Sequence, residues 1–224
     1  MVMKTRSYNQ YCGLAYALDV VGERWTILII RELVAGPRRF KDLLAGLPEI
    51  STNLLSERLK HLEQQAVIHR RTLPPPAGST VYELTELGRG LEPMLLALGK
   101  WGSQFVPEVP GEAAILHVGS YALTLKTFFR PELAQGLDET YALQIDGEVL
   151  QVHIHDGTLD VGPGDPHDAA MILRTEMPTY LALLAGKLAP DVALAQGLIG
   201  VEGDAEALER FLAICGIPQH AGPA

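Results

Sequence analysis

Residues 38–86 read RRFKDLLAGLPEISTNLLSERLKHLEQQAVIHRRTLPPPAGSTVYELTE. The spacing of their apolar residues and the position of their turn residues predict two helices followed by two strands, at about 40–47, 52–65, 67–73 and 80–84. The strands are separated by Pro74, Pro75, Pro76 and Gly78, which suit a hairpin tip because proline cannot donate a hydrogen bond to a strand ladder. The stretch therefore predicts a two-helix unit that continues into a hairpin.

The helix expected at 52–65 has one apolar and one polar face. Ser51 is placed to cap it, because a serine hydroxyl can accept a hydrogen bond from a free backbone N–H of the first turn. Leu55, Leu59 and Leu62 recur with helical spacing and are expected to face a core. The opposite face is either a solvated surface or one that can read base edges and phosphates, and it carries Asn53, Ser56, Glu57 and Lys60.

Basic residues on both sides of this polar face favour the second interpretation. Arg38 and Arg39 precede the first helix and Arg70 and Arg71 lie on the hairpin, as expected of a phosphate-binding surface. The order of the elements is that of a winged helix-turn-helix, a module that mostly binds double-stranded DNA. The residues expected to bind DNA are Arg38, Arg39, Ser51, Thr52, Asn53, Ser56, Glu57, Lys60, Arg70, Arg71, Ser79 and Thr80.

The composition is that of a globular chain without a membrane span. Hydrophobic residues make up 47% of the 224, and no apolar run reaches about 18 residues. The N-terminal residues lack the apolar centre of a signal peptide, so a cytoplasmic location is expected. Cys12 and Cys215 lie far apart without metal-ligand spacing, which indicates a reducing compartment and no disulfide framework.

Charge is distributed unevenly along the chain. Residues 1–105 carry 13 basic and 10 acidic side chains, a net charge of +3, whereas residues 106–224 carry 5 and 17, a net charge of −12. This asymmetry predicts two domains with different partners, at 1–105 and 112–224, joined by a linker at 106–111. The acidic half would repel DNA, so DNA binding is expected from the first half alone.

The other helices of the first half form its scaffold. Two apolar helical segments are expected between residues 8 and 35, with Leu14, Leu18 and Val21 on one face of the first. After an interruption at Gly22, the second is expected to continue almost as a buried helix from Trp25, with Ile27, Leu28, Ile30 and Leu33. Another helix is expected at 85–104, interrupted mildly at two glycines. Its apolar stripe consists of Leu91, Leu95, Leu98 and Trp101. Such a stripe packs either on its own domain or on a second subunit, and a homodimer is the expected assembly.

The motifs of this half resemble those of the HxlR-type winged helix-turn-helix transcriptional regulators over roughly residues 8–105. They are Gly-x-x-Trp at 22–25, Gly-Pro-x-Arg-Phe at 36–40, Ile50-Ser51, Arg58-Leu59, Leu62-Glu63 and Tyr-x-Leu-Thr-x-x-Gly at 82–88. The resemblance implies a small dimeric repressor or activator. Ala66 stands where that family usually has glycine, and a left-handed backbone at alanine costs about 1 kcal/mol, which leaves open a different local turn.

The second half alternates strand-like runs with turns. Strands are expected at 140–145, 148–155, 158–161, 169–175 and 198–201, and helices at 112–129, 178–184, 191–196 and 204–214. Asp146-Gly147 and Asp156-Gly157 are strong signals for two-residue hairpin turns. An antiparallel sheet covered by helices, an α+β domain, is the predicted architecture.

The turn motifs of this half resemble the sterol-carrier-protein-2 fold over about residues 112–218. They are Ile145-Asp146-Gly147, Asp156-Gly157, the 179–186 segment with Lys187, Gly197-Leu198-Ile199 and Gly203-Asp204. The resemblance implies a sheet covered by helices around an apolar tunnel, and hence an apolar or lipid-like effector. The residues that could line this tunnel, or equally form an ordinary core, are Met171, Leu173, Tyr180, Leu183, Leu184 and Leu188.

No catalytic or cofactor-binding motif is present in the sequence. It contains no phosphate-cradling glycine loop after a strand, no nucleophile elbow and no zincin motif, so neither an enzyme nor a cofactor is expected. His153 and His155 share one face of an expected strand, but a metal site needs a third ligand, for which His167 and Asp168 are the candidates near in sequence. A surface histidine pair without a metal is the expectation.

Cys12 is a candidate redox residue, because several HxlR-type regulators carry a sensing cysteine at about this place, 13 residues before Trp25. A sensor thiol needs a depressed pKa, and the cations near it in sequence are Lys4, Arg6 and Arg24. The alternative is a small buried core residue.

The expected function is a DNA-binding transcriptional regulator, a homodimer on an inverted repeat, modulated by an apolar small molecule in the second half. Two alternatives remain open. One is a redox-sensing regulator that uses Cys12 beside a structural C-terminal domain. The other is a lipid carrier or enzyme whose first half mediates protein contacts.

Overall fold

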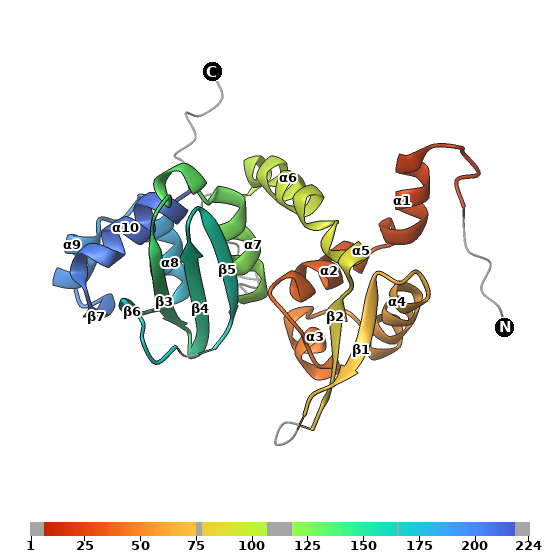
Figure 1. The fold of residues 1–224 in the computed structure, drawn as a ribbon, viewed down its shortest axis with the longest axis horizontal. Helices are drawn as coiled ribbons and strands as arrows, with labels where there is room; N and C mark the ends of the chain where they lie inside the picture. Colours follow the sequence, from red (N-terminus) through yellow and green to blue (C-terminus); the bar gives the residue numbers. More distant parts are fainter. Residues whose placement is uncertain (1–6, 75–77, 107–117, 165, 218–224) are drawn as a thin grey trace. The chain divides into compact units, whose positions relative to one another are not determined.

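The computed structural model describes residues 7–74, 78–106, 118–164 and 166–217, and the chain divides into two compact units, residues 1–98 and 99–224 (Figure 1). The predicted domain bounds stay a prediction, because most of the expected linker lies outside the described residues, as do Pro75 and Pro76 of the hairpin tip and the first residues of the helix expected at 112–129. Within the described ranges no helix is long and apolar enough to cross a bilayer.

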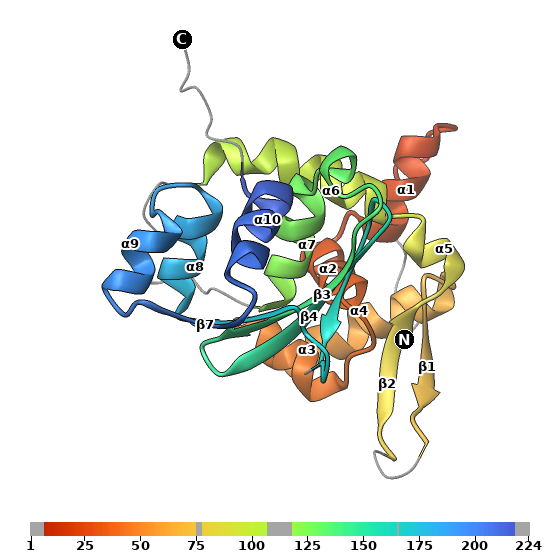
Figure 2. The same ribbon diagram turned by 60° about the vertical axis from the view of Figure 1, so that its left-hand side comes forward.

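The first unit is a helix-turn-helix followed by a hairpin, as predicted. Its elements are α1 (Gly13–Val21), α2 (Thr26–Val34), α3 (Phe40–Gly46), α4 (Thr52–Gln64), β1 (Ile68–Thr72), β2 (Thr80–Leu84), α5 (Glu86–Arg89) and the start of α6 (Glu92–Gly102). The two strands pair antiparallel, with Ile68 opposite Leu84 and Thr72 opposite Thr80. Figure 2 shows this hairpin, the wing, extending away from α3 and α4.

The core of this unit forms where the apolar faces of α2, α3 and α4 meet the base of the wing. Its side chains are almost fully buried and include Ile29, Ile30, Leu33, Leu43, Leu55, Leu59, Leu62, Ile68, Val81 and Leu84. The predicted cap of α4 is confirmed, because the Ser51 hydroxyl accepts a hydrogen bond from the backbone N–H of Leu54 at 3.2 Å. The leucines expected to face a core therefore do so.

A tight crossing of two backbones joins the end of α4 to the start of α5. Ala66 has a φ of 55°, so it keeps the left-handed turn despite its side chain. The Thr85 hydroxyl accepts a hydrogen bond from Gly88 N at 3.1 Å and donates to Ala66 O at 2.6 Å. Gly88 permits this approach, because a Cβ there would lie 2.1 Å from the carbonyl oxygen of Val67.

Two expectations for the scaffold helices were wrong in detail. Trp25 does not continue a buried helix but caps α2 in the left-handed region, with a φ of 77°. The helix expected at 85–104 is divided into α5, α6 and a 3₁₀ turn, η1 (Ser103–Phe105), with Gly90 at the end of α5. Of the predicted stripe Leu95 is buried, whereas Trp101 is 59% exposed.

The second unit is an α+β domain. It contains α7 (Val118–Phe128), η2 (Pro131–Leu133), β3 (Asp138–Ile145), β4 (Glu148–His155), β5 (Thr158–Pro163), β6 (Met171–Thr175), α8 (Met177–Leu184), α9 (Pro190–Ala195), β7 (Ile199–Gly203) and α10 (Ala205–Cys215). The predicted hairpin turns are confirmed, since Asp146, Gly147, Asp156 and Gly157 all have positive φ.

The sheet of this unit is mixed, which corrects the antiparallel expectation. Its strand order is β5-β4-β3-β6-β7, and β6 runs parallel to β3 while the other neighbours are antiparallel. The reason is that β6 follows β5 in sequence but joins the sheet on the other side of β3. Helices α7, α8 and α10 lie on one face, behind the sheet in Figure 1, and Tyr141 of β3 packs there against Phe211 of α10.

Candidate nucleic-acid interface

The outward face of α4 carries the side chains expected to read DNA. Asn53, Ser56 and Lys60 are exposed, while the leucines on the opposite face are buried. The Ser56 hydroxyl donates to the carbonyl oxygen of Thr52 at 2.8 Å, so its oxygen remains free to accept a hydrogen bond. Asn53 and Lys60 have no polar partner within the residues that the structure describes. This face therefore offers unused donors and acceptors on a rigid helix.

Side chains at the back and end of α4 hold it in place. Arg58 donates to Glu57 at 2.8 Å and to Glu23, in the turn after α1, at 3.1 Å. His61 Nε2 lies 3.2 Å from the carbonyl oxygen of Val20. Glu57, which was expected to face DNA, thus engages Arg58. The sequence analysis did not predict these contacts. The adjacent opposite charges of Glu57 and Arg58 were the signal that could have indicated an ion pair between them.

The wing arginines already have carboxylate partners. Arg70 Nε donates to Glu63 of α4 at 2.7 Å. Arg71 forms two hydrogen bonds with Glu83 of β2, at 3.0 and 2.9 Å. Hydrogen bonding to Arg71 holds the pKa of the Glu83 carboxyl below its ordinary value, and the nearby His69 adds to the effect. The positive charges of Arg70 and Arg71 are thus partly neutralised in the protein without DNA.

The arginines before α3 serve the fold as well as the surface. The backbone of Arg38 pairs with that of Tyr82 through hydrogen bonds of 3.0 and 2.8 Å, which fastens the start of α3 to the wing. The Arg38 side chain is half-buried and its Nε lies 3.4 Å from the carbonyl oxygen of Glu32. Arg39 caps α3, and its backbone N–H donates to Asp42 at 3.1 Å.

The remaining predicted contacts lie at the ends of the elements. Thr52 opens α4 and Thr80 opens β2, and both are exposed. The Ser79 hydroxyl is buried and has no hydrogen-bond partner among the described residues. Lys41 on α3 is an exposed cation that sequence reasoning missed, although its place in the first helix of the pair is where such modules cross the phosphate backbone.

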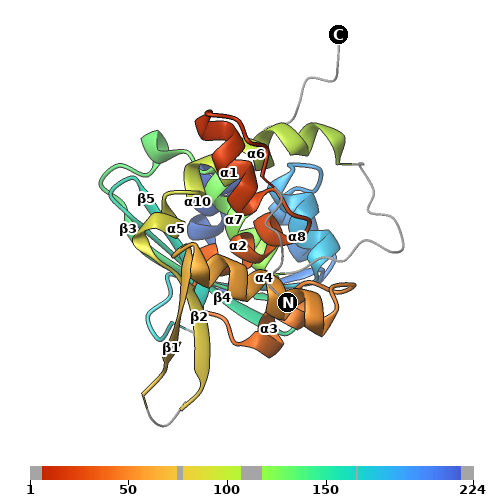
Figure 3. The same cartoon turned by 90° about the vertical axis from the view of Figure 1, so that its right-hand side faces the viewer.

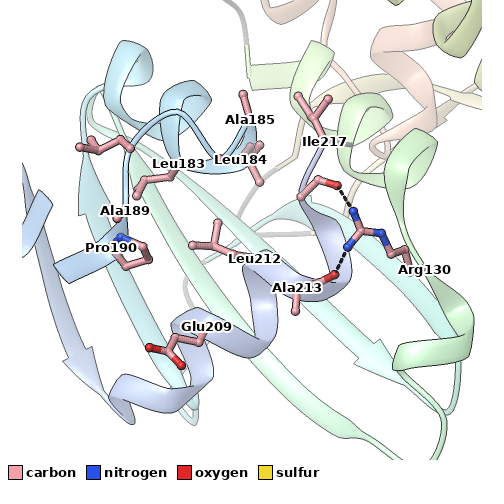
Figure 4. Close-up of a pocket in the computed structure, with 13 residues that line it drawn as sticks. Arg130, Leu183, Leu184, Ala185, Ala189, Pro190, Glu209, Leu212, Ala213 and Ile217 are labelled. Carbon is pink, nitrogen blue, oxygen red and sulfur yellow. Dashed lines mark hydrogen bonds between the residues drawn. The ribbon is translucent and has the colours of Figure 1, made fainter. Parts of the chain in front are cut away.

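A pocket of about 450 Å³ opens in the second unit between α8, the start of α9 and α10 (Figure 4). Three of the six predicted tunnel residues, Leu183, Leu184 and Leu188, line it. The other three, Met171, Leu173 and Tyr180, are fully buried and are absent from its lining. Sequence reasoning missed the α10 wall, which includes Leu212 and Ala213, and also missed Arg130.

Polar groups at this pocket come from Arg130 and Glu209. The Arg130 guanidinium donates to the carbonyl oxygens of Ala213 and Gly216 near the C-terminal end of α10. The pocket therefore combines an apolar wall with a cation at one end. The neighbouring Tyr180 hydroxyl is buried without a partner in the described part of the chain, and its burial raises the pKa of the phenol well above the ordinary value.

The two cysteines lie in opposite environments. Cys12 is exposed at the N-cap of α1, which excludes the buried alternative. The nearby backbone N–H groups, that of Ala15 more than that of Leu14, lower the pKa of its thiol. Cys215 is buried in α10, and burial raises the pKa of its thiol to about 12. The expected cations Lys4 and Arg6 lie outside the described residues, and Arg24 lies over the Trp25 ring at 5.3 Å.

Comparison with known proteins finds two family matches in this chain. The model of the HxlR-like helix-turn-helix family matches residues 20–110, and the model of the SCP-2 sterol transfer family matches residues 124–216. The HTH-type transcriptional regulator YodB of Bacillus subtilis is 40% identical over 89 residues, which are 40% of this chain and 80% of that protein. The uncharacterized HTH-type transcriptional regulator sll1512 of Synechocystis is 36% identical over 105 residues, 47% of this chain and 78% of that one.

Among solved structures, the redox regulator HypR in its oxidized form is similar to part of this chain. It is 31% identical and the match covers 44% of this chain and 100% of that chain, with a TM-score of 0.40.

Proposed function

We propose that this chain, which belongs to the HxlR-like helix-turn-helix family and is a DNA-binding transcriptional regulator, acts as a homodimer whose operator affinity responds to an apolar small molecule in its SCP-2-like second domain. The observation that carries the proposal is the exposed polar face of α4, backed by three buried leucines and capped by Ser51. A regulator of this kind acts where the DNA is, so the chain is expected in the cytoplasm.

Helix α4, the proposed reading helix, would enter the major groove with its N-terminal residues toward the bases. Asn53 suits adenine, because a side-chain amide can pair with both the acceptor and the donor of that base. Lys60, two turns further along α4, suits a phosphate, and Lys41 on α3 suits another. In a dimer the two copies of α4 must lie one helical turn of DNA apart, about 34–36 Å, or a multiple of it.

Exposed apolar side chains support the dimer. On α1, Leu14 is 69% exposed, and the neighbouring aromatic residues Tyr8, Tyr11 and Tyr16 are exposed as well. Figure 3 shows the first turns of α1 extending away from α2 and α4, whereas its last turn contacts α4 through Val20. Further along the chain Leu98, Trp101 and Phe105 are exposed in the same way. Side chains of this size and number on so small a module are typical of an interface between subunits.

The pocket between α8 and α10 is the candidate effector site. Its apolar wall suits a hydrocarbon chain or ring system, and Arg130 at its edge suits a carboxylate or hydroxyl. A ligand that binds there and changes operator affinity must itself bind with a different affinity when DNA is bound, because coupling between sites is reciprocal.

Two measurements on the full chain test this proposal. A gel shift over a salt series should show specific binding that falls steeply as salt rises, because phosphate contacts release counterions. Fatty acids and sterols added in turn should raise the melting temperature and change the operator affinity. Salt-independent or absent DNA binding contradicts the reading helix, whereas DNA binding without any ligand response contradicts the effector site alone.

A second candidate, supported by the exposure and lowered pKa of Cys12, is a redox-sensing regulator with a structural second domain. A peroxide would convert the Cys12 thiolate to a sulfenic acid with loss of hydroxide, and this change at the start of α1 would alter the proposed dimer. Loss of operator binding under peroxide that Cys12→Ser prevents distinguishes it from the ligand route. The remaining alternative, a lipid carrier or enzyme with a protein-binding first half, disagrees with the family, whose relatives here are transcriptional regulators.

A further inference from the structure

Three side chains with metal-ligand chemistry meet on the sheet of the second unit, away from the pocket. Asp138 is the first residue of β3 and lies opposite His155, the last residue of β4. His153 is two residues before His155 and therefore projects from the same face of β4. Among the described residues, Asp138, His153 and His155 are the group of three potential metal ligands that the fold brings together. The sequence-near candidates His167 and Asp168 are not part of the group.

The ligand atoms are close enough to share one ion. His153 Nε2 lies 3.0 Å from one carboxylate oxygen of Asp138, and His155 Nδ1 lies 3.3 Å from the other. The two imidazole rings are stacked, with centroids 6.0 Å apart. All three ligand atoms lie within 4.8 Å of one another. Two ligands of one zinc ion, each bound at about 2.0–2.2 Å, lie roughly 3.3 Å apart. Small side-chain rotations thus bring the three into coordination distance.

The surroundings favour a cation. The strand residues that pair directly with the histidines bring no positive charge: Thr140 and Asp160 flank His153, and Thr158 lies opposite His155 on β5. Asp160 is exposed and adds a second carboxylate beside His153. The side chains of Asp138, His153 and His155 are 66%, 39% and 61% exposed, so an ion can reach them from solvent.

We propose that Asp138, His153 and His155 bind a late first-row divalent transition metal ion, for which Zn²⁺ is the probe. Two imidazole nitrogens and one carboxylate oxygen suit zinc and its neighbours, whereas Mg²⁺ and Ca²⁺ prefer ligand sets made of oxygen. Three protein ligands leave a position for water or for an outside ligand. The ion would tie the first residue of β3 to the last residues of β4 and so stabilise that end of the sheet.

Isothermal titration of the full chain, without a histidine tag, with Zn²⁺ tests the proposal. We expect one equivalent to bind, and His153→Gln, His155→Gln and Asp138→Asn each to weaken binding by about tenfold or more, because each removes a ligand. His167→Gln is the matched control, since it removes an exposed histidine outside the group and should leave affinity unchanged. Equal losses in His167→Gln, or no binding in the parent chain, would overturn the proposal.

Two further measurements distinguish this site from zinc bound elsewhere on the chain. Zinc bound by the exposed thiol would disappear in Cys12→Ser, so retained stoichiometry in that variant supports the site and loss of it overturns the site. Thermal unfolding should shift upward with Zn²⁺, not with Mg²⁺, and the shift should be lost in His155→Gln. A shift of the same size in His155→Gln as in the parent would place the ion elsewhere. None of these readouts depends on DNA binding or on the apolar pocket.

Discussion

Arg70 of the wing donates from Nε to Glu63 of the reading helix at 2.7 Å. The pair joins α4 to the wing, the two elements that we expect to contact DNA. The hydrogen bond to Glu63 raises the pKa of the Arg70 guanidinium above its ordinary value. The sequence predicted Arg70 as a free phosphate contact. In the structure its charge is shared with a carboxylate, so the wing is less positive than its sequence indicates.

Glu63→Gln should therefore strengthen binding to DNA of any sequence. Removing the carboxylate frees Arg70 for a phosphate, and one additional phosphate contact steepens the salt dependence of the logarithm of affinity by about one. Gel shifts on random DNA at several salt concentrations measure both effects. Glu86→Gln, which removes an exposed acid at the start of α5, is the control for charge alone. An equal gain in both variants would mean that the Arg70 pair is irrelevant to binding.

Asn53→Ala should relax sequence preference, and Lys60→Ala should not. A good base contact is worth about 1–3 kcal/mol against the wrong base, whereas a phosphate contact is sequence-independent. Operator and scrambled duplexes should therefore become more alike for the Asn53 variant and should weaken together for the Lys60 variant. Equal losses on both duplexes in both variants would contradict the assignment of α4 as the reading helix.

Gly88→Ala should destabilise the first domain by about 1–3 kcal/mol, because its Cβ would overlap the carbonyl oxygen of Val67 and the two backbones must separate. Denaturant unfolding monitored by circular dichroism measures the change. Gly13→Ala is the matched control, since a Cβ at Gly13, the first residue of α1, has no atom within 4 Å and should leave stability unchanged or slightly raised. Similar losses of stability in both variants would show that the close approach of Gly88 to the backbone of Val67 does not contribute to stability.

Leu188→Glu should abolish the response to an apolar ligand while the fold and basal DNA binding remain. Leu188 is half-buried in the pocket wall, and a carboxylate there opposes an apolar ligand. In the parent chain, ligand at about 100 times its dissociation constant should add roughly 2.7 kcal/mol to the stability of the second domain. Leu198→Glu, at an exposed leucine outside the pocket, is the control and should keep the full response.

Iodoacetamide should modify Cys12 in the native chain and leave Cys215 unmodified. The thiolate is the reactive form, and a lowered pKa together with exposure favours it at Cys12, whereas burial protects Cys215 and raises the pKa of its thiol. Mass spectrometry of peptides taken over time, with and without denaturant, measures the two rates. Native modification of Cys215 at a rate like that of Cys12 would contradict the packing of α10.

Local signals were sufficient for most elements of both halves, although not for the division of the helix expected at 85–104. Leucines at helical spacing, a serine before the first turn and paired Asp-Gly turns placed α4, the wing and the β3–β4–β5 hairpins close to where the structure has them. These features depend on backbone preferences and on apolar periodicity within about a dozen residues, which is why the sequence alone determined them. Gly22 of the motif at 22–25 is likewise explained locally, because a Cβ there would lie 2.5 Å from the carbonyl oxygen of Leu18, whereas Gly88 of the motif at 82–88 faces the carbonyl oxygen of Val67, which only the fold brings near.

Only the tertiary structure decided which side chains meet. The parallel pairing of β6 with β3 and the α10 wall of the pocket join residues far apart in sequence, and the carboxylates that engage Arg70 and Arg71 come from different elements, α4 and β2. The third member of the histidine group is the clearest case. The search near His153 and His155 indicated His167 and Asp168, whereas strand pairing brought Asp138 from another strand. The register of a sheet is set by the packing of its whole buried face, and no local pattern contains that information.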